Sequence, residues 1–187
     1  MAEVVEDGVI LSDGTKLEAD LIVYATGFDA MTGSLMNCNI VGRDGLPLRK
    51  KWAAGPGNYL GLMTTGFPNM FTITGPGSPS ALANLITGIE QHAEFITNLI
   101  AWADARGHRT VEPVQEEEDR WVEIVNQRAN FTLYPNCNSW YLGANVPGKP
   151  RVFMPYVGGV GAYRQKCDEV TAAGYEGFTL GKESVSA

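Results

Sequence analysis

The stretch Leu21-Ile-Val-Tyr-Ala-Thr-Gly-Phe-Asp29 decides how this chain is interpreted. Residues 21–25 are continuously apolar, which is typical of a strand buried on both faces of a sheet. Gly27 lacks a Cβ, so the backbone can turn there and a neighbouring strand or a ligand can come close. Such a run usually ends a strand late in a nucleotide-binding protein. Here it comes early, which indicates either a small domain with an unusual beginning or the later part of a larger protein.

The composition is that of a globular protein and argues against nucleic-acid binding. Of 187 residues, 44% are hydrophobic and 19% are charged, and the net charge is −7. Surfaces that bind phosphate backbones need clustered Lys and Arg instead. Cys38, Cys137 and Cys167 form no CxxC pattern, which favours a reduced intracellular protein without a zinc site or a disulfide framework.

No feature of the chain predicts a membrane anchor or a leader. No apolar run approaches the roughly 18 residues that a bilayer-spanning helix needs. The N-terminus, MAEVVEDG, lacks the basic and apolar regions of a signal peptide. We therefore expect a cytoplasmic protein.

Turn residues divide the first part of the chain into short strands. Glu6-Asp7-Gly8 and Ser12-Asp13-Gly14 separate short apolar runs, which predicts a β-meander over residues 3–26 that ends in the buried strand 21–25. A second buried strand is predicted at 70–74, and shorter strands are predicted at 39–41, 59–63 and 152–157.

Three helices follow from hydrophobic spacing and end signals. The longest is predicted from Ser78, as N-cap, and Pro79, at the first helical position, to a stop at Gly107. Two adjacent apolar stripes predict that much of its circumference is buried. The others are predicted at 116–129, where Glu116–Asp119 are interpreted as a solvated helix start, and at 163–173.

The helix entry Gly75–Leu82, GPGSPSAL, is the best candidate site on physical grounds. The first amides of a helix lack internal partners and carry partial positive charge, so a phosphate or an electron-rich ring suits that position. An ordinary capped helix after a tight turn is the competing interpretation. His92 lacks the HExxH spacing of a zinc site and is interpreted as a packed histidine.

The loop 139–150, SWYLGANVPGKP, is a second candidate. It places an aromatic pair beside small residues and the basic Lys149. Trp140 could stack against a planar ligand, with nearby polar groups meeting a ribose or a phosphate. The alternative is a tryptophan that fills a gap in the core.

These motifs together resemble one enzyme family. LIVYATGFDAMTG (21–33), GPGSPSALANL (75–85), IEQH (89–92), SWYLGANVPGKP (139–150) and YVGGVGAYR (156–164) are similar to the C-terminal part of flavin-dependent Baeyer–Villiger monooxygenases. PSAL (79–82) and GKPRVFMPYVGG (148–159) most resemble the phenylacetone and steroid monooxygenase subgroup. The resemblance extends from about residue 4 to residue 180, in the family's order.

The resemblance implies an α/β fold, namely the C-terminal half of a flavoprotein with two dinucleotide-binding domains, one for FAD and one for NADPH. Residues 1–27 would be the last β-meander and strand of the NADPH-binding domain. Residues 28–187 would be the C-terminal half of the FAD-binding domain, an incomplete Rossmann-like domain. In this family NADPH reduces FAD, and a flavin C4a-peroxide formed with O₂ converts ketones to esters or lactones.

The resemblance also assigns residues to roles. Thr26 and Gly27 would approach the cofactors at the interdomain junction, Leu85 would lie against the flavin ring, and Trp140 would contact NADP. Met154 would line the ketone pocket with the helix-entry residues Pro79, Ser80, Ala81 and Leu82. None of these transfers a proton, so the segment would contribute binding and shape.

Other hallmarks of the family are not found in this sequence. It contains neither GxGxxG nor FxGxxxHxxxW, and the family's catalytic arginine would precede residue 1. We therefore expect the chain to act only together with the N-terminal remainder of the enzyme and to be inactive alone. The alternatives are a non-catalytic module that binds a nucleotide or a partner, and a heteroatom-oxidising flavin monooxygenase, against which SWYLGANVPGKP argues.

Overall fold

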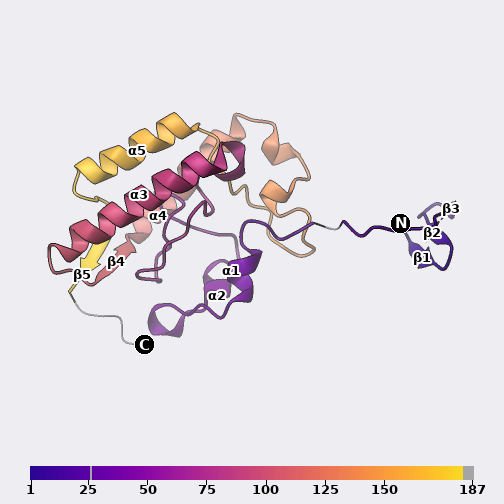
Figure 1. The fold of residues 1–187 in the computed structure, drawn as a ribbon, viewed down its shortest axis with the longest axis horizontal. Coiled ribbons are helices and arrows are strands. Elements are labelled where there is room, and N and C mark those ends of the chain that lie inside the picture. Colours follow the sequence, from indigo (N-terminus) through magenta and orange to yellow (C-terminus); the bar gives the residue numbers. More distant parts are fainter. Residues whose placement is uncertain (26, 183–187) are drawn as a thin grey trace.

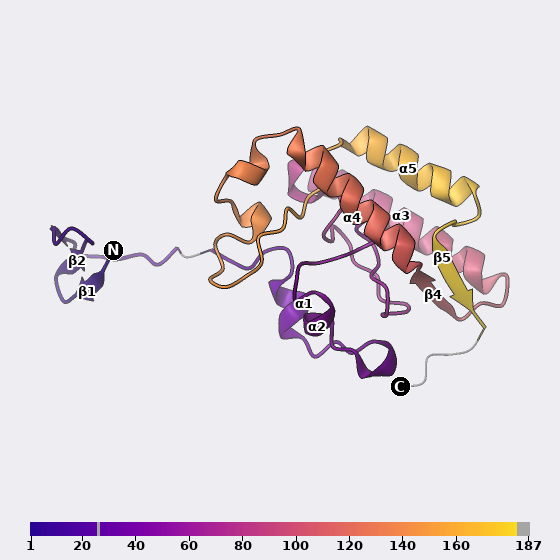
Figure 2. The ribbon, with the colours of Figure 1, turned by 180° about the vertical axis from the view of Figure 1, so that it is seen from behind.

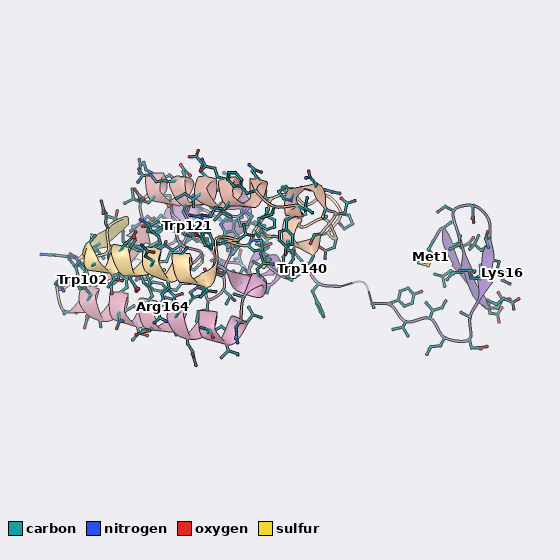
Figure 3. The ribbon with its side chains drawn as sticks, turned by 90° about the horizontal axis from the view of Figure 1, so that it is seen from above. Met1, Lys16, Trp102, Trp121, Trp140 and Arg164 are labelled. Atoms are coloured by element: carbon teal, nitrogen blue, oxygen red, sulfur yellow. The ribbon has the colours of Figure 1, made fainter. Side chains whose placement is uncertain are left out.

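The computed structural model describes residues 1–25 and 27–182, which form a mixed α/β structure. Three helices, α3 (Leu85–Asp104), α4 (Gln115–Asn130) and α5 (Val160–Ala172), run side by side in the main body. Viewed from above, α5 lies between the other two (Figure 3). None of the helices in the described ranges is long and apolar enough to cross a membrane.

The described strands form two small antiparallel sheets. β1 (Glu3–Val5), β2 (Gly8–Ile10) and β3 (Lys16–Glu18) make the predicted meander, with Val4 opposite Val9 and Val9 opposite Leu17. β4 (Thr110–Pro113) pairs with β5 (Phe178–Gly181) at one end of the three helices (Figure 1). The sequence pattern predicts neither β4 nor β5.

Short helices complete the body. α1 (Gly33–Asn37) and α2 (Leu48–Lys51) lie beside one another below α3 and α4 in Figures 1 and 2. Single 3₁₀ turns occur at Arg43–Gly45, Ser80–Leu82, Tyr134–Asn136 and Trp140–Leu142.

The main core lies among the three helices and the loop 59–63. α3 contributes Phe95 and Leu99, α4 contributes Trp121, and α5 contributes Tyr163, all of them buried. The Tyr163 hydroxyl donates to the carbonyl of Leu60 at 2.7 Å, which satisfies a polar group that burial would otherwise leave without a partner. Two smaller apolar clusters lie around Trp52 and Phe153.

The predicted strand at residues 21–25 is wrong for this structure. The segment is extended but unpaired, and Leu21 exposes 79% of its surface. A continuously apolar strand needs neighbours on both edges and cover on both faces, and the described residues supply neither here. Figure 1 shows it as part of a thin connection between the β1–β3 meander and the body.

The other predicted strands reduce to single bridges or to unpaired chain. Val41 and Tyr59–Met63 make isolated bridges, and residues 70–74 make one, between Phe71 and Met63. Residues 152–157 are mostly buried, but they form no strand, and the chain bends at Pro155. Pro155 within that segment has no N–H to donate to a ladder.

The predicted helices 116–129 and 163–173 are confirmed to within a few residues, whereas the long helix begins later than predicted. α3 starts at Leu85, and its N-cap is Asn84 rather than Ser78. His92, Phe95 and Leu99 of one apolar stripe are buried, and so are Ile96 and Ala103 of the other. Leu85, Ile86, Ile89 and Ile100 are exposed, so less of the circumference is buried than predicted.

Candidate functional site

The turn Gly75–Ser78 lies at the centre of the candidate site. The Gly77 amide donates to the carbonyl of Met154 at 2.7 Å, and the Tyr156 amide donates to the carbonyl of Ser78 at 2.7 Å. The Met154 amide in turn donates to the carbonyl of Tyr141 at 3.0 Å. Three motifs that lie far apart in sequence are therefore joined through backbone hydrogen bonds.

Glycine permits this close packing. A Cβ on Gly61 would lie 2.4 Å from the Ser78 nitrogen, and the backbone of Gly61 has a φ of +70°. A Cβ on Gly75 would lie 2.6 Å from the Gly61 carbonyl oxygen. Only glycine fits at both positions without displacing the backbone opposite.

A buried carboxylate holds the adjacent loop in place. Glu118 of α4 accepts hydrogen bonds from the Thr65 amide at 2.6 Å and from the Thr64 hydroxyl at 3.0 Å, and it pairs with Lys51 at 2.8 Å. The predicted solvated helix start is therefore wrong for Glu118, which is 2% exposed. Its burial is compatible with charge because the carboxylate has both an ion-pair partner and hydrogen-bond donors.

Two amides at the start of α3 are already hydrogen bonded within the chain. The Asn84 side chain accepts from the amides of Ile86 and Thr87 at 3.1 and 3.4 Å, so the helix is capped by its own chain. The predicted helix start within GPGSPSAL is therefore wrong, and the helix is capped by Asn84 rather than by Ser78. Leu85 follows the cap and exposes 45% of its surface.

The four predicted pocket residues of the helix entry form a tight turn before α3. Pro79 and Ser80 are buried, and Ser80 has a φ of +46°, a conformation that non-glycine residues rarely adopt. The Ser80 hydroxyl donates to the Met31 sulfur at 3.6 Å, which places this turn beside the segment that follows Gly27. Ala81 belongs to the same 3₁₀ turn, and Leu82 packs on the cluster around Phe153.

His92 is hydrogen bonded to the residue just before the Gly75–Ser78 turn. It is fully buried in α3, and its Nδ1 accepts a hydrogen bond from the Thr74 amide at 3.0 Å. Burial lowers the pKa of His92 to about 4, because the imidazolium would lose its hydration. The imidazole is therefore neutral near pH 7, and the prediction of a packed, hydrogen-bonded histidine is confirmed.

Trp140 stands at the edge of the body rather than in the core. It exposes 37% of its surface, and its ring lies 4.1 Å from the ring of Tyr141. Figure 3 places it at the end of the body where the connection to the meander departs. The alternative of a tryptophan that fills a core gap is therefore wrong, and the indole is accessible to a ligand.

Side chains of the loop 139–150 bind the segment that follows Gly27. Lys149 forms an ion pair with Asp29 and donates to the Thr32 hydroxyl at 2.7 Å. The Asn145 side chain donates to the carbonyl of Phe28 at 2.9 Å. Gly27 itself is exposed and faces Asn145, whereas Thr26 lies outside the described residues.

A cavity of about 290 Å³ lies between this loop and the body. Asp29, Thr32 and Lys149 form its polar side, whereas Trp52, Val152 and Met154 contribute to its apolar side. Met154, predicted to line a ligand pocket, thus does border a cavity. Pockets that bind small molecules combine apolar walls with a few polar groups in this way.

The structure brings most of the predicted site residues into one region. Met154 is hydrogen bonded to the Gly75–Ser78 turn and to Tyr141, the residue that follows Trp140. Leu85 lies apart from these contacts at the start of α3. Sequence reasoning missed Asp29, Asn145 and Glu118, because their partners lie far away in sequence and only the fold reveals them.

Comparisons with known proteins agree with the motifs. No family model matches the chain. It is 47% identical over 94% of its length to an acetone monooxygenase (methyl acetate-forming) of a Gordonia species, and 39% identical over 94% to a Baeyer–Villiger monooxygenase of Pseudooceanicola batsensis. A phenazine N-monooxygenase of Lysobacter antibioticus is 40% identical over 95%. The chain covers 33%, 32% and 32% of these proteins, so it spans about a third of their length.

Solved structures give the same result. An oxidised steroid monooxygenase bound to NADP matches 96% of this chain with a TM-score of 0.84 and 48% identity, over 33% of its own length. A complex of OTEMO with FAD and NADP matches 95% with a TM-score of 0.85 and 37% identity, over 32% of its length. The resemblance to Baeyer–Villiger and steroid monooxygenases is therefore confirmed, along a segment equal to about a third of such an enzyme.

Proposed function

We propose that this chain is the C-terminal portion of an FAD- and NADPH-dependent Baeyer–Villiger monooxygenase, which converts ketones to esters or lactones with O₂. The observation that carries the proposal is the joining of Gly77, Ser78, Tyr141, Met154 and Tyr156 through backbone hydrogen bonds, because these residues belong to the motifs that define the resemblance. The 47% identity to an acetone monooxygenase supports the ketone as substrate class.

The described residues fit the two cofactors in character. Leu85, Ile86 and Ile89 expose an apolar strip at the start of α3, which suits a flat aromatic ring system such as that of a flavin. Trp140 exposes an indole that can contact a nucleotide. FAD, when bound, supplies the redox chemistry, and the protein supplies binding, orientation and exclusion of water.

We assign the residues accordingly. Trp140 contacts NADPH, Leu85 lies against the flavin, and Met154 lines the ketone pocket together with residues 79–82. Thr26 and Gly27 form the junction between a part of the NADPH domain at 1–27 and a Rossmann-like half of the FAD domain at 28–187. The protein acts in the cytoplasm.

The relatives keep a second reaction class open. A protein 40% identical to this chain is named a phenazine N-monooxygenase, so similarity at this level is compatible with oxidation of nitrogen as well as of ketones. A module that binds a nucleotide or a partner and catalyses nothing is a further alternative. The test must therefore separate ester formation, heteroatom oxidation and binding alone.

A chimera provides that test. The N-terminal two thirds of the Gordonia acetone monooxygenase would be joined to this chain at the amino-acid sequence Ala-Thr-Gly, residues 25–27. We expect the chimera to retain FAD, to oxidise NADPH when a ketone is added, and to form the ester. A folded chimera that binds FAD but oxidises only amines or sulfides would favour the heteroatom reaction. One that folds without retaining FAD would overturn the proposal.

A further inference from the structure

Two side chains of the loop 139–150 connect it to a segment more than a hundred residues earlier in the chain. The Lys149 ammonium pairs with the Asp29 carboxylate and also donates to Thr32, and Asn145 donates to the Phe28 carbonyl. Within the part of the chain that the structure describes, these are the polar contacts that tie residues 143–150 to other elements. The remaining hydrogen bonds of those residues lie inside the loop.

The ion pair is shielded from solvent more than an ordinary surface pair. The Lys149 side chain is 15% exposed and the Asp29 side chain 31% exposed. Reduced solvation strengthens the attraction between opposite charges, and the Thr32 hydroxyl gives the ammonium a second partner. The attraction is therefore less screened by solvent than in a fully exposed ion pair.

The stem of Lys149 connects the ion pair to the turn that carries Trp140. A Cβ on Gly143 would lie 2.9 Å from the Cδ of Lys149, so the aliphatic stem lies directly over Gly143. Gly143 has a φ of +71° and ends the 3₁₀ turn Trp140–Leu142. One side chain thus packs on the end of this turn and reaches across to Asp29.

We propose that Lys149 is a positioning residue. Its ion pair with Asp29 latches the loop 139–150 to the segment 28–32, so that the position of Trp140 follows the position of that segment. Because the segment 28–32 continues from the connection to the β1–β3 meander, a displacement there is transmitted to Trp140. The latch does not depend on the proposed function; its effect on NADPH does.

Hydrogen exchange of the full 187-residue chain tests the latch. The variants are Lys149→Met, which keeps most of the stem over Gly143 but removes the charge, Asp29→Asn, and the two combined. Each single variant should raise amide exchange in residues 139–150 about tenfold, as expected for a lost charge-assisted hydrogen bond. The double variant should add little to either single change, because both remove the same contact.

Matched variants separate the latch from a general loss of stability. Lys166→Met removes a surface charge of α5 and should leave exchange in the loop unchanged. In Lys149→Arg, amide exchange of residues 139–150 should stay within about twofold of that in the original chain, because arginine keeps a cation that reaches Asp29. Amides of α3 and α4 should keep their protection in every variant.

Two results would overturn the latch: unchanged exchange in the loop of Lys149→Met and Asp29→Asn, or effects of the two that add fully in the double variant. If Lys149→Met loses protection throughout the chain, Asp29→Asn decides the question alone, since it changes neither size nor packing. In the chimera, Lys149→Met should raise the KM for NADPH about tenfold with little change in kcat. A latch confirmed by exchange without that KM effect would contradict the NADPH role proposed for Trp140.

Discussion

The His92 imidazole holds the Thr74 backbone immediately before the Gly75–Ser78 turn, and its neutrality makes stability depend on pH. Its pKa is lowered by burial to about 4 in the folded chain, below the ordinary value of 6.5. The unfolded chain therefore binds the proton first, and the free energy of unfolding should fall as the pH drops from about 6.5 to about 4. The full loss is about 3 kcal/mol.

Urea unfolding at pH 7.5 and pH 4.5 measures this loss. His92→Asn should remove most of the difference, because an amide can still accept from Thr74 but has no proton to gain in this range. His108→Asn serves as the control for the other histidine and should keep the pH dependence. A His92→Asn chain that loses as much stability as the original would show that another group is responsible.

Gly61 and Gly88 differ in what a methyl group would meet. At Gly61 it would collide with the Ser78 backbone nitrogen at 2.4 Å, and the φ of +70° adds strain. Gly61→Ala should lower the free energy of unfolding by about 2–4 kcal/mol. Gly88 lies inside α3 with no atom within 4 Å of such a methyl, so Gly88→Ala should stabilise the chain by up to about 1 kcal/mol. Chemical denaturation of both variants checks the opposite signs.

The start of α3 shows how one side chain fixes an element boundary. Asn84→Ala removes the acceptor for the amides of Ile86 and Thr87 and should cost about 1 kcal/mol. Amide exchange of residues 86 and 87 should accelerate first, and Asn84→Asp should retain the protection. Equal exchange in the Ala and Asp variants would mean that the cap contributes nothing.

Helices were predictable from this sequence and strands largely were not, for a physical reason. α4 and α5 carry their own hydrogen bonds, so local spacing and end signals located them to within a few residues. Residues 21–25 and 70–74 have the composition of strands, but a strand exists only where another strand pairs with it. β4 and β5 were missed because their pairing joins Thr110–Pro113 to residues far along the chain.

The candidate site was predictable in its motifs but not in its contacts. The loop 139–150 could be singled out because its residue types are unusual together, and Met154 because of the family resemblance. The hydrogen bond from the Thr65 amide to Glu118 and the pairing of Asp29 with Lys149 could not be predicted, since both depend on tertiary contacts between distant segments. Ser78 was misjudged as the helix cap because Ser-Pro fits the local rule equally well.

In the molecule as a whole, several large apolar side chains of the described residues remain exposed, and two groups of them lie close together in sequence. Leu85, Ile86 and Ile89 expose one face of α3, and Leu21, Val23, Tyr24 and Phe28 are exposed along the connection to the meander. Monomeric proteins seldom expose large contiguous apolar patches, and such patches mark surfaces that pair with other protein or bind ligands. The relatives are about three times as long as this chain, and in the enzyme proposed above the rest of the protein would cover these patches.

The isolated chain should therefore associate with itself. We expect sedimentation velocity to show a mass that rises with concentration, because burial of apolar surface favours contact between copies. Ile86→Glu combined with Ile89→Glu should lower that association, while Thr97→Glu, a charge at an exposed polar position of the same helix, should not. In the chimera, Ile86→Glu combined with Ile89→Glu should reduce FAD retention, because the apolar strip of Leu85, Ile86 and Ile89 is expected to be covered in the complete enzyme. A chain that stays monomeric at all concentrations, with no effect of the α3 changes, would show that these residues form no interface.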